Sequence, residues 1–350
     1  MQAPTARTEP PHHLVVRAPN WVGDVVMATP VLEAAAREVG AASGLERLSV
    51  AIRSHLAPVL HDGPLADHLL PFHGRDGEAR ALADCGADAA LLFTNSLGAA
   101  WRAFRSGIPV RVGTALGGRG PLLSHRIAPP RSDGRRVPAP TVHVYADLAG
   151  QLGIVPSNLD LVLHHRPELD EELRQRLEGH GLARDEGYVL CVPGAAFGAA
   201  KLWPPTHHAA ALDALHDRTG LRGLVTGGPG EEPTIRAVVE ACRHPVIDFT
   251  EEPRDLERLK PLISQASLVL CSDSGPRWYA AAYRRPRVAL VGPTFVELVT
   301  TTEEERILRL GLECSPCLER VCPLGHHRCM VELGPERAVA AGLALLGVAP

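Results

Sequence analysis

Aromatic residues and long apolar runs are both scarce in this chain. Phe, Trp and Tyr make up 4% of its 350 residues, so we expect helices to pack closely on small side chains. No eighteen consecutive residues are apolar, which excludes a membrane-spanning helix. Residues 1–12 are polar, contain prolines and lack the apolar core of a secretory signal. We therefore expect a disordered leader and a cytoplasmic protein.

An excess of positive charge is also absent. The formal net charge is −4 and the pI is about 6.5, so no global field draws the chain to nucleic acid or to anionic lipid. Contact with a membrane surface is left to local basic patches, for example Arg102, Arg105, Arg111, Arg119 and Arg126. The apolar fraction of 45% and charged fraction of 22% are typical of globular proteins.

Short apolar strands alternate with helices in two parts of the chain, which predicts an α/β fold with two Rossmann-like, doubly wound domains. The first domain covers 13–160, with a helix over 25–39 that has Pro30 near its start. The alternation stops in 154–187, where we place a linker (161–187) and a charged helix near 168–178. It resumes in the second domain, 188–350. The expected strands are 13–17, 48–52, 89–93 and 110–113 in the first domain, and 188–192, 223–226, 245–248, 268–271 and 287–291 in the second.

Several loops that follow these strands carry residues suited to chemistry at a domain cleft, where ligands of such folds bind. Asn20, Gly23 and Asp24 follow the first strand; Asp24 is either a helix cap or a general base. Lys201 follows the strand 188–192 and is either a solvated surface lysine or a partner for a diphosphate.

Two more loops belong to the second half. Thr226, Gly227 and Gly228 lead to Glu231, which is either part of a plain turn or an acceptor for ribose hydroxyls. The stretch 272–276, Ser-Asp-Ser-Gly-Pro, ends a strand and opens a helix. It is either an ordinary N-cap or a phosphate seat built on a helix N-terminus.

The order of five motifs resembles the ADP-heptose:lipopolysaccharide heptosyltransferases of glycosyltransferase family 9, in particular their heptosyltransferase II branch. The motifs are 17–24 (RAPNWVGD), 193–204 (PG with KLWP), 226–228 (TGG), 272–276 (SDSGP) and 292–294 (GPT). The resemblance extends from about residue 14 to 340 and includes the Cys-rich tail. It implies a GT-B fold, in which two Rossmann-like domains face each other across a cleft.

The same resemblance implies a function. Heptose would pass with inversion, and without a metal cofactor, from ADP-L-glycero-D-manno-heptose to the lipopolysaccharide inner core. The acceptor, a lipid A–core molecule, would be met at the cytoplasmic face of the inner membrane. Asp24 would be the base, with Asn20 and Gly23 on the acceptor side. The donor would meet Lys201, Thr226, Glu231, Asp273, Ser274 and Gly275.

The sequence departs from the family at two places on the donor side. Arg277 and Trp278 stand where Met-His is usual, and residues 295–300 replace a basic loop. Two alternatives therefore stay open: a family 9 transferase with another nucleotide sugar or acceptor, and a nucleotide-sugar-binding homologue without turnover.

Eight cysteines fall into two groups. Cys85, Cys191, Cys242 and Cys271 are scattered among apolar neighbours and are expected to act as small buried hydrophobes. Cys314, Cys317, Cys322 and Cys329 form a C-x2-C-x4-C-x6-C pattern, which suits a structural zinc or iron–sulfur site, disulfides or unligated thiols. A reducing cytoplasm favours metal or free thiols over disulfides.

Overall fold

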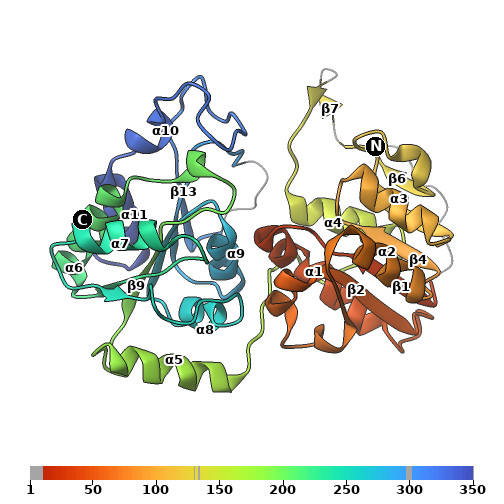
Figure 1. The fold of residues 1–350 in the computed structure, drawn as a ribbon, viewed down its shortest axis with the longest axis horizontal. Coiled ribbons are helices and arrows are strands. Elements are labelled where there is room, and N and C mark those ends of the chain that lie inside the picture. The colour runs from red at the N-terminus through yellow and green to blue at the C-terminus, as the bar shows by residue number, and fades with distance from the viewer. Residues whose placement is uncertain (1–10, 130, 133–134, 297–301, 350) are drawn as a thin grey trace. The chain divides into compact units, whose positions relative to one another are not determined.

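The computed structural model describes residues 11–129, 131–132, 135–296 and 302–349. The chain divides into two compact units, the first reaching His164 and the second beginning at His165. Each unit has its own six-stranded parallel sheet (Figure 1). Part of the loop over 295–300, where the sequence departs from the family, lies outside the described residues.

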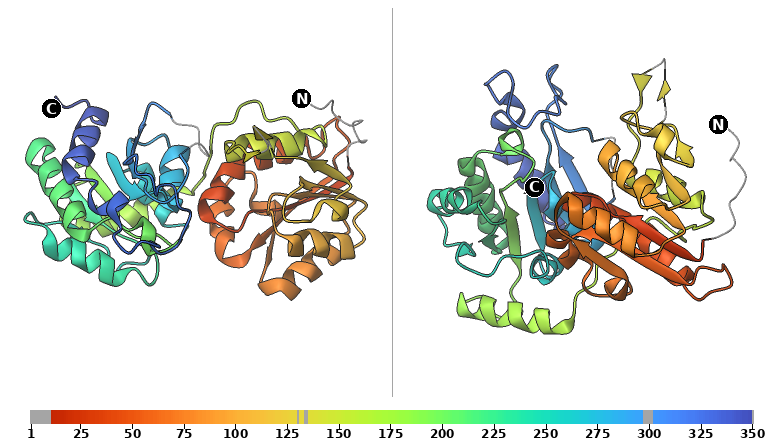
Figure 2. Two further views of the ribbon diagram at one scale, coloured as in Figure 1. Left: turned by 90° about the horizontal axis from the view of Figure 1, so that it is seen from above. Right: turned by 45° about the vertical axis from the view of Figure 1, so that its right-hand side comes forward.

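The first unit has the strand order β3-β2-β1-β4-β5-β6, with every pairing parallel. Its central strands β1 and β4 are buried along their whole length, because in a parallel sheet helices cover both faces (Figure 2). The strands are β1 His13–Arg17, β2 Arg47–Arg53, β3 Leu69–Phe72, β4 Ala89–Leu92, β5 Val110–Thr114 and β6 His125–Ile127. The helices are α1 Val22–Glu38, α2 Gly74–Asp84, α3 Leu97–Arg105 and α4 Thr141–Gly150; a small hairpin joins β7 Arg131–Ser132 to β8 Arg135–Arg136.

The second unit repeats this order as β11-β10-β9-β12-β13-β14. Its strands are β9 Tyr188–Val192, β10 Arg222–Val225, β11 Ile247–Asp248, β12 Leu268–Ser272, β13 Arg287–Leu290 and β14 Glu305–Leu308. Its helices are α5 Pro167–Gly179, α6 Pro205–Thr219, α7 Glu232–Ala241, α8 Leu259–Ser264, α9 Gly275–Ala282, α10 Arg328–Val331 and α11 Pro335–Leu345. The α/β, doubly wound fold class expected from the sequence is confirmed.

Helix α1 begins three residues earlier than expected. Trp21 is extended and precedes the helix, so Gly23 and Asp24 lie in its first turn. Pro30 consequently lies in the helix interior, where it cannot donate a hydrogen bond to Val26. The Thr29 hydroxyl donates to the Val26 carbonyl instead, at 2.8 Å, which keeps this carbonyl satisfied.

The second sheet has six strands instead of the expected five. The strand missed by the sequence, β14, is half polar, and its Glu305 is buried beside two arginines. The expected strand 245–248 is shorter, Ile247–Asp248. Helix α5, expected in the linker region, belongs to the second unit and buries Leu169, Leu173 and Leu177.

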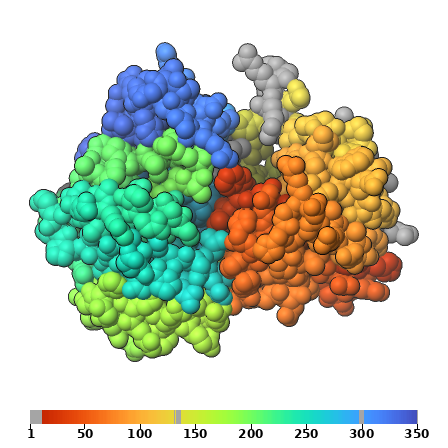
Figure 3. Space-filling model, viewed as in Figure 1, coloured from red at the N-terminus to blue at the C-terminus, as the bar shows by residue number. Residues whose placement is uncertain are grey.

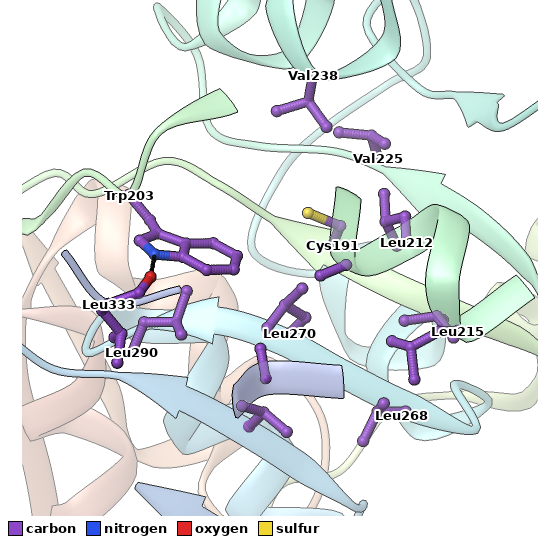
Figure 4. Close-up of a cluster of buried hydrophobic side chains, with 14 of the residues drawn as sticks. Cys191, Trp203, Leu212, Leu215, Val225, Val238, Leu268, Leu270, Leu290 and Leu333 are labelled. Atoms are coloured by element: carbon purple, nitrogen blue, oxygen red, sulfur yellow. Dashed lines mark hydrogen bonds between the residues drawn. The ribbon is translucent and has the colours of Figure 1, made fainter. Parts of the chain in front are cut away.

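The core of the second unit holds the loop after β9 in place. Trp203 is 1% exposed, and its indole N–H donates to the Leu333 carbonyl at 2.7 Å (Figure 4). It packs in one cluster with Cys191, Leu270 and Leu290 from three neighbouring strands. The neighbouring Lys201 is therefore carried by a rigidly anchored segment. Cys191 and Cys271 are buried as expected, whereas Cys85 and Cys242 are only partly buried.

Candidate functional site

The loops that the sequence singled out in the second half follow four neighbouring strands. Strands β10, β9, β12 and β13 lie side by side, and their carboxyl ends lead to Thr226, Pro193, Asp273 and Val291. The strand order reverses between β9 and β12, which is the position where doubly wound sheets bind ligands.

Lys201 and Asp273 meet across this switch point. Lys201 is 8% exposed, and its Nζ donates to the Asp273 carboxylate at 2.9 Å and to the Asp273 backbone carbonyl. Arg277 Nη1 and the Thr294 hydroxyl donate to the same carboxylate at 2.9 and 2.7 Å. The alternative of a solvated surface lysine is thus wrong: the ammonium group is held in one position by a buried partner.

The basic side chains around Asp273 determine its protonation. Burial by itself raises the pKa of the Asp273 carboxyl, but Lys201 and Arg277 outweigh burial and lower the pKa to about 2. Glu305 accepts from Arg277 at 2.7 Å and from Arg287 at 3.1 Å. Lys201, Arg277 and Arg287 thus share the carboxylates of Asp273 and Glu305 in one buried network.

The start of α9 is not an ordinary capped helix. Ser274 is its N-cap residue, but its side chain makes no capping hydrogen bond and its hydroxyl donates to the Ser272 carbonyl at 3.3 Å. The Asp273 carboxylate is likewise engaged elsewhere. The alternative of an ordinary side-chain N-cap is therefore wrong: the first turn of α9, which begins at Gly275, receives no hydrogen bond from the Ser274 side chain.

Glu231 is packed into the same group of loops. Its carboxylate accepts from the Gly228 N–H at 2.7 Å, and burial raises the pKa of this carboxyl. A Cβ atom at Gly194 would lie 1.9 Å from Glu231 Oε2, so a larger residue there would displace the Glu231 carboxylate. The Gly194 carbonyl in turn accepts from Ser272 at 3.3 Å, which connects Glu231 to the Asp273 loop.

The unusual pair Arg277 and Trp278 has a structural role. Arg277 is 1% exposed and bonds both Asp273 and Glu305. Its guanidinium lies 4.9 Å from the Trp278 ring, a cation–π contact. This arginine therefore helps to fix the carboxylate that holds Lys201. The sequence pattern did not assign Arg277, Thr294 or Glu305 to the site.

The scarcity of lysine in this chain also draws attention to Lys201. The chain has 36 basic residues, and only two of them, Lys201 and Lys260, are lysines. A lysine retained in so arginine-rich a chain suggests a compact, rotatable ammonium in place of a planar guanidinium.

In the first unit, Asp24 lies in the first turn of α1 and is half-buried. It lies near enough to Tyr145 to contribute, after burial, to raising the pKa of that phenol. The N-cap residue is Trp21, so Asp24 is not the capping residue. The helix dipole favours an ionised carboxylate at this position.

Asn20 is fixed by two arginines. Its Oδ1 accepts from Arg17 at 2.8 Å and from Arg53 at 2.9 Å. Arg17 is itself held by the buried Glu78, at 2.9 Å, and Glu78 also accepts from Arg102 at 2.9 Å. The end of β1 and the loop that carries Asn20 into α1 are therefore held in place.

Not all of the arginines expected in a basic patch are on the surface. Arg119 is fully buried and donates to the carbonyls of Thr94 and Thr114 and to Asn95 Oδ1. Arg102 is largely covered and paired with Glu78. These acceptors compensate for the burial of the two guanidinium groups, so Arg102 and Arg119 stabilise the fold and do not form a surface patch.

The four clustered cysteines lie in a segment that covers 312–333 (blue, Figures 1 and 3). All four are free thiols, and together with His326 they line one small cavity of about 20 Å³. Within the described ranges, no three His, Cys, Asp or Glu side chains lie close enough together to hold a metal ion. The disulfide alternative is not realised in this structure.

This Cys-rich segment is hydrogen-bonded to two of the site loops. The Ala200 N–H donates to the Arg320 backbone carbonyl at 2.9 Å, and the Ala200 carbonyl accepts from the His327 ring at 2.8 Å. Gly292 and Pro293 accept from Ser315 at 2.6 Å and from the Leu318 N–H at 2.8 Å. The segment therefore braces the loops on which Lys201 and Thr294 reside.

Two doubly wound parallel units, with charged and glycine-rich loops at the carboxyl ends of their strands, define an α/β protein of the GT-B class. The solved structure of E. coli ADP-heptose lps heptosyltransferase II has the same fold, with a TM-score of 0.73 and 23% identity over 95% of this chain and 98% of that chain. The family model of glycosyltransferase family 9 (heptosyltransferase) matches residues 78–328, and the chain belongs to this family.

Two relatives specify the similarity further. Lipopolysaccharide heptosyltransferase 2 of Escherichia coli K12 is 25% identical over 95% of this chain and 98% of its own length. Lipooligosaccharide heptosyltransferase 2 of Campylobacter jejuni serotype O:2 is 30% identical over 44% of this chain and 49% of its own length. The chain thus spans about half the length of this Campylobacter relative. No helix among the described segments is long and apolar enough to cross a membrane.

Proposed function

We propose that this family 9 protein is an inverting heptosyltransferase, which moves heptose from ADP-L-glycero-D-manno-heptose to the lipopolysaccharide inner core. The observation that carries the proposal is the buried Lys201–Asp273 pair at the switch point, beside the N-terminus of α9. A diphosphate is the anion that an ammonium group and a helix N-terminus suit. The names of the relatives supply the sugar and the acceptor.

The donor half of the reaction is assigned to the second unit. Lys201 and the backbone N–H groups of Ser274 and Gly275 stabilise the charge that develops on the ADP leaving group. Thr226 and Glu231 bind the nucleoside, with the Glu231 carboxylate accepting from ribose hydroxyls. Asp273 is a positioning residue, because its carboxylate is occupied by Lys201, Arg277 and Thr294.

The acceptor half is assigned to the first unit, with Asn20 before α1 and Gly23 in its first turn on the acceptor side of Asp24. The acceptor hydroxyl oxygen forms a bond to the anomeric carbon as the bond from that carbon to the diphosphate oxygen breaks. Asp24 takes the hydroxyl proton, and ADP leaves with the electron pair. Attack opposite the leaving group inverts the anomeric centre. No step needs a metal ion or an organic cofactor.

A turnover assay tests this function. Purified protein is supplied with ADP-heptose and a heptose-bearing core acceptor, and release of ADP is measured together with the mass of the product. We expect the acceptor to gain one heptose. Turnover only with another nucleotide sugar, or on another acceptor, would favour the broader family activity. Binding of ADP-heptose without turnover under any of these conditions would favour a non-catalytic role.

The location follows from the acceptor. A lipid A–core acceptor is anchored in the inner membrane, so the protein works at the cytoplasmic face as a peripheral enzyme. The absence of a spanning helix in the described part of the chain is compatible with this arrangement.

A structural metal at Cys314, Cys317, Cys322 and Cys329 is a second part of the proposal. Four thiols that share one ion-sized cavity support zinc or iron, although the side chains must turn toward the ion to complete its ligand set. A metal there would act on structure alone, by bracing the loops that Ala200 and Pro293 belong to.

Metal analysis of the purified full-length protein tests this site. We expect about one zinc or iron per chain, as for a structural four-ligand site. The double variant C317S/C329S should lose the metal and bind ADP more weakly, whereas C242S should keep both. A metal-free wild type would contradict the proposal, and thiol titration would then separate free cysteines from disulfides.

A further inference from the structure

Helix α3 (Leu97–Arg105) presents its large apolar side chains to solvent. Leu97, Trp101 and Phe104 are 52%, 50% and 44% exposed, and their spacing of four and three residues places them on one face. The opposite face consists of Ala99, Ala100 and Ala103, which are completely buried. A helix of a globular protein normally buries its large apolar residues, so this arrangement is inverted. Small residues anchor the helix, and aromatic residues cover it outside.

The exposed rings form one continuous surface with arginines at its border. The Trp101 and Phe104 ring centroids lie 5.8 Å apart. The Arg105 guanidinium lies 6.0 Å from the Trp101 ring and that of Arg111 lies 5.3 Å from the Phe104 ring. We call Leu97, Trp101, Phe104, Arg105 and Arg111 the α3 patch. Its composition combines apolar contact area with positive charge.

The segment that carries the α3 patch is basic. Residues 89–132 include six arginines and no Asp or Glu; of the six, Arg102 is paired with Glu78 and Arg119 is buried. The Arg111 guanidinium donates to the backbone carbonyls of Ile108, Pro109 and Leu122, and among the residues that the structure describes it pairs with no carboxylate. Arg105 and Arg126 are exposed, and no carboxylate pairs with either within the described ranges. The patch is thus complementary to an anionic surface.

We propose that the α3 patch seats the protein on an anionic lipid bilayer. Trp, Phe and Leu side chains enter the boundary between headgroups and acyl chains, while the bordering arginines meet lipid phosphates. The choice of a bilayer, and not a protein, as the partner rests on the proposed function, because its acceptor is anchored in lipid. The seating would hold the enzyme at the surface where that acceptor is found.

Sedimentation with lipid vesicles tests the proposal on the full-length protein. We expect the wild type to sediment with vesicles of phosphatidylglycerol and phosphatidylcholine, and less with phosphatidylcholine alone or at high salt. The variant W101S/F104S should lower the vesicle-bound to free ratio at least about tenfold, because two of the three inserting side chains are lost. R105Q should weaken binding only to the anionic vesicles.

Matched controls isolate the α3 patch. V155S removes an apolar side chain that is 72% exposed in the same unit, and R184Q removes an exposed arginine of the other unit. Both should bind vesicles like the wild type. Wild-type protein that stays in solution, or W101S/F104S that binds as well as the wild type, would overturn the proposal. So would a wild-type dimer that W101S/F104S dissociates, since a second copy would then cover the patch.

A soluble acceptor separates this inference from the proposed function. Core oligosaccharide without its lipid should be glycosylated equally by the wild type and by W101S/F104S. Turnover on this acceptor combined with no binding to anionic vesicles would refute the membrane surface alone. Vesicle binding that W101S/F104S abolishes, combined with no turnover by the wild type, would refute the heptosyltransferase and leave the surface.

Discussion

Replacing Asp24 by Asn is expected to lower heptose transfer by roughly 100- to 10,000-fold, the usual contribution of a general base. Asn retains the size and polarity of the side chain but cannot accept the hydroxyl proton. ADP affinity should stay near the wild-type value, because the donor residues lie in the other unit. Single-turnover rates and ADP titration by calorimetry measure the two quantities separately.

A matched control exists for the helix contribution of this carboxylate. Asp76 lies in the first turn of α2, is exposed and has no assigned role in transfer. D76N loses the same favourable interaction with a helix dipole, which is worth about 0.3–1 kcal/mol. It should transfer heptose at the wild-type rate. If D24N also kept that rate, the assignment of Asp24 as the base would be wrong.

Replacing Lys201 by Met is expected to weaken ADP binding by roughly 10- to 100-fold, which corresponds to one lost charge-assisted hydrogen bond. Met preserves most of the apolar stem, which is mostly buried near Phe197. The variant should also lower the free energy of unfolding by about 1–3 kcal/mol, because Asp273 loses one of its partners while Arg277 and Thr294 remain.

The other lysine provides the control. Lys260 is completely buried in α8 and is not among the donor residues. K260M should change stability without changing the ADP affinity of the protein that remains folded. If K201M bound ADP as tightly as the wild type, the donor role of Lys201 would be refuted. If K260M weakened ADP binding equally, loss of stability and not of a phosphate contact would be the cause.

Central strands can be predicted from the sequence more easily than edge strands. The central strands β1, β4, β9 and β12 are buried on both faces, so each leaves a continuous apolar run that predicts it. The edge strand β14 is stabilised differently, since its buried Glu305 is neutralised by Arg277 and Arg287. An ion pair between distant residues leaves no local pattern, and the strand was missed.

The same reasoning applies to the site. Lys201 and Asp273 were both singled out, but nothing local in either motif shows that they bond to each other across 72 residues of chain. The burial of Arg119, which removes it from the expected basic patch, also depends on acceptors from Thr94 and Asn95 in another loop. Inverted helix α3 is a third case, because helical periodicity identifies an apolar face without showing which face is covered.

The sequence by itself determined the two doubly wound halves, the family, and the loops that carry Asp24, Lys201 and Asp273. These features depend on short-range periodicity and on the order of motifs, which the chain displays directly. Only the tertiary structure decided that Asp273 positions Lys201, that the Cys-rich segment braces the neighbouring loops, and that α3 turns its aromatic residues outward. Each of these depends on contacts between residues far apart in the chain, and packing and desolvation act only once the fold has brought them together.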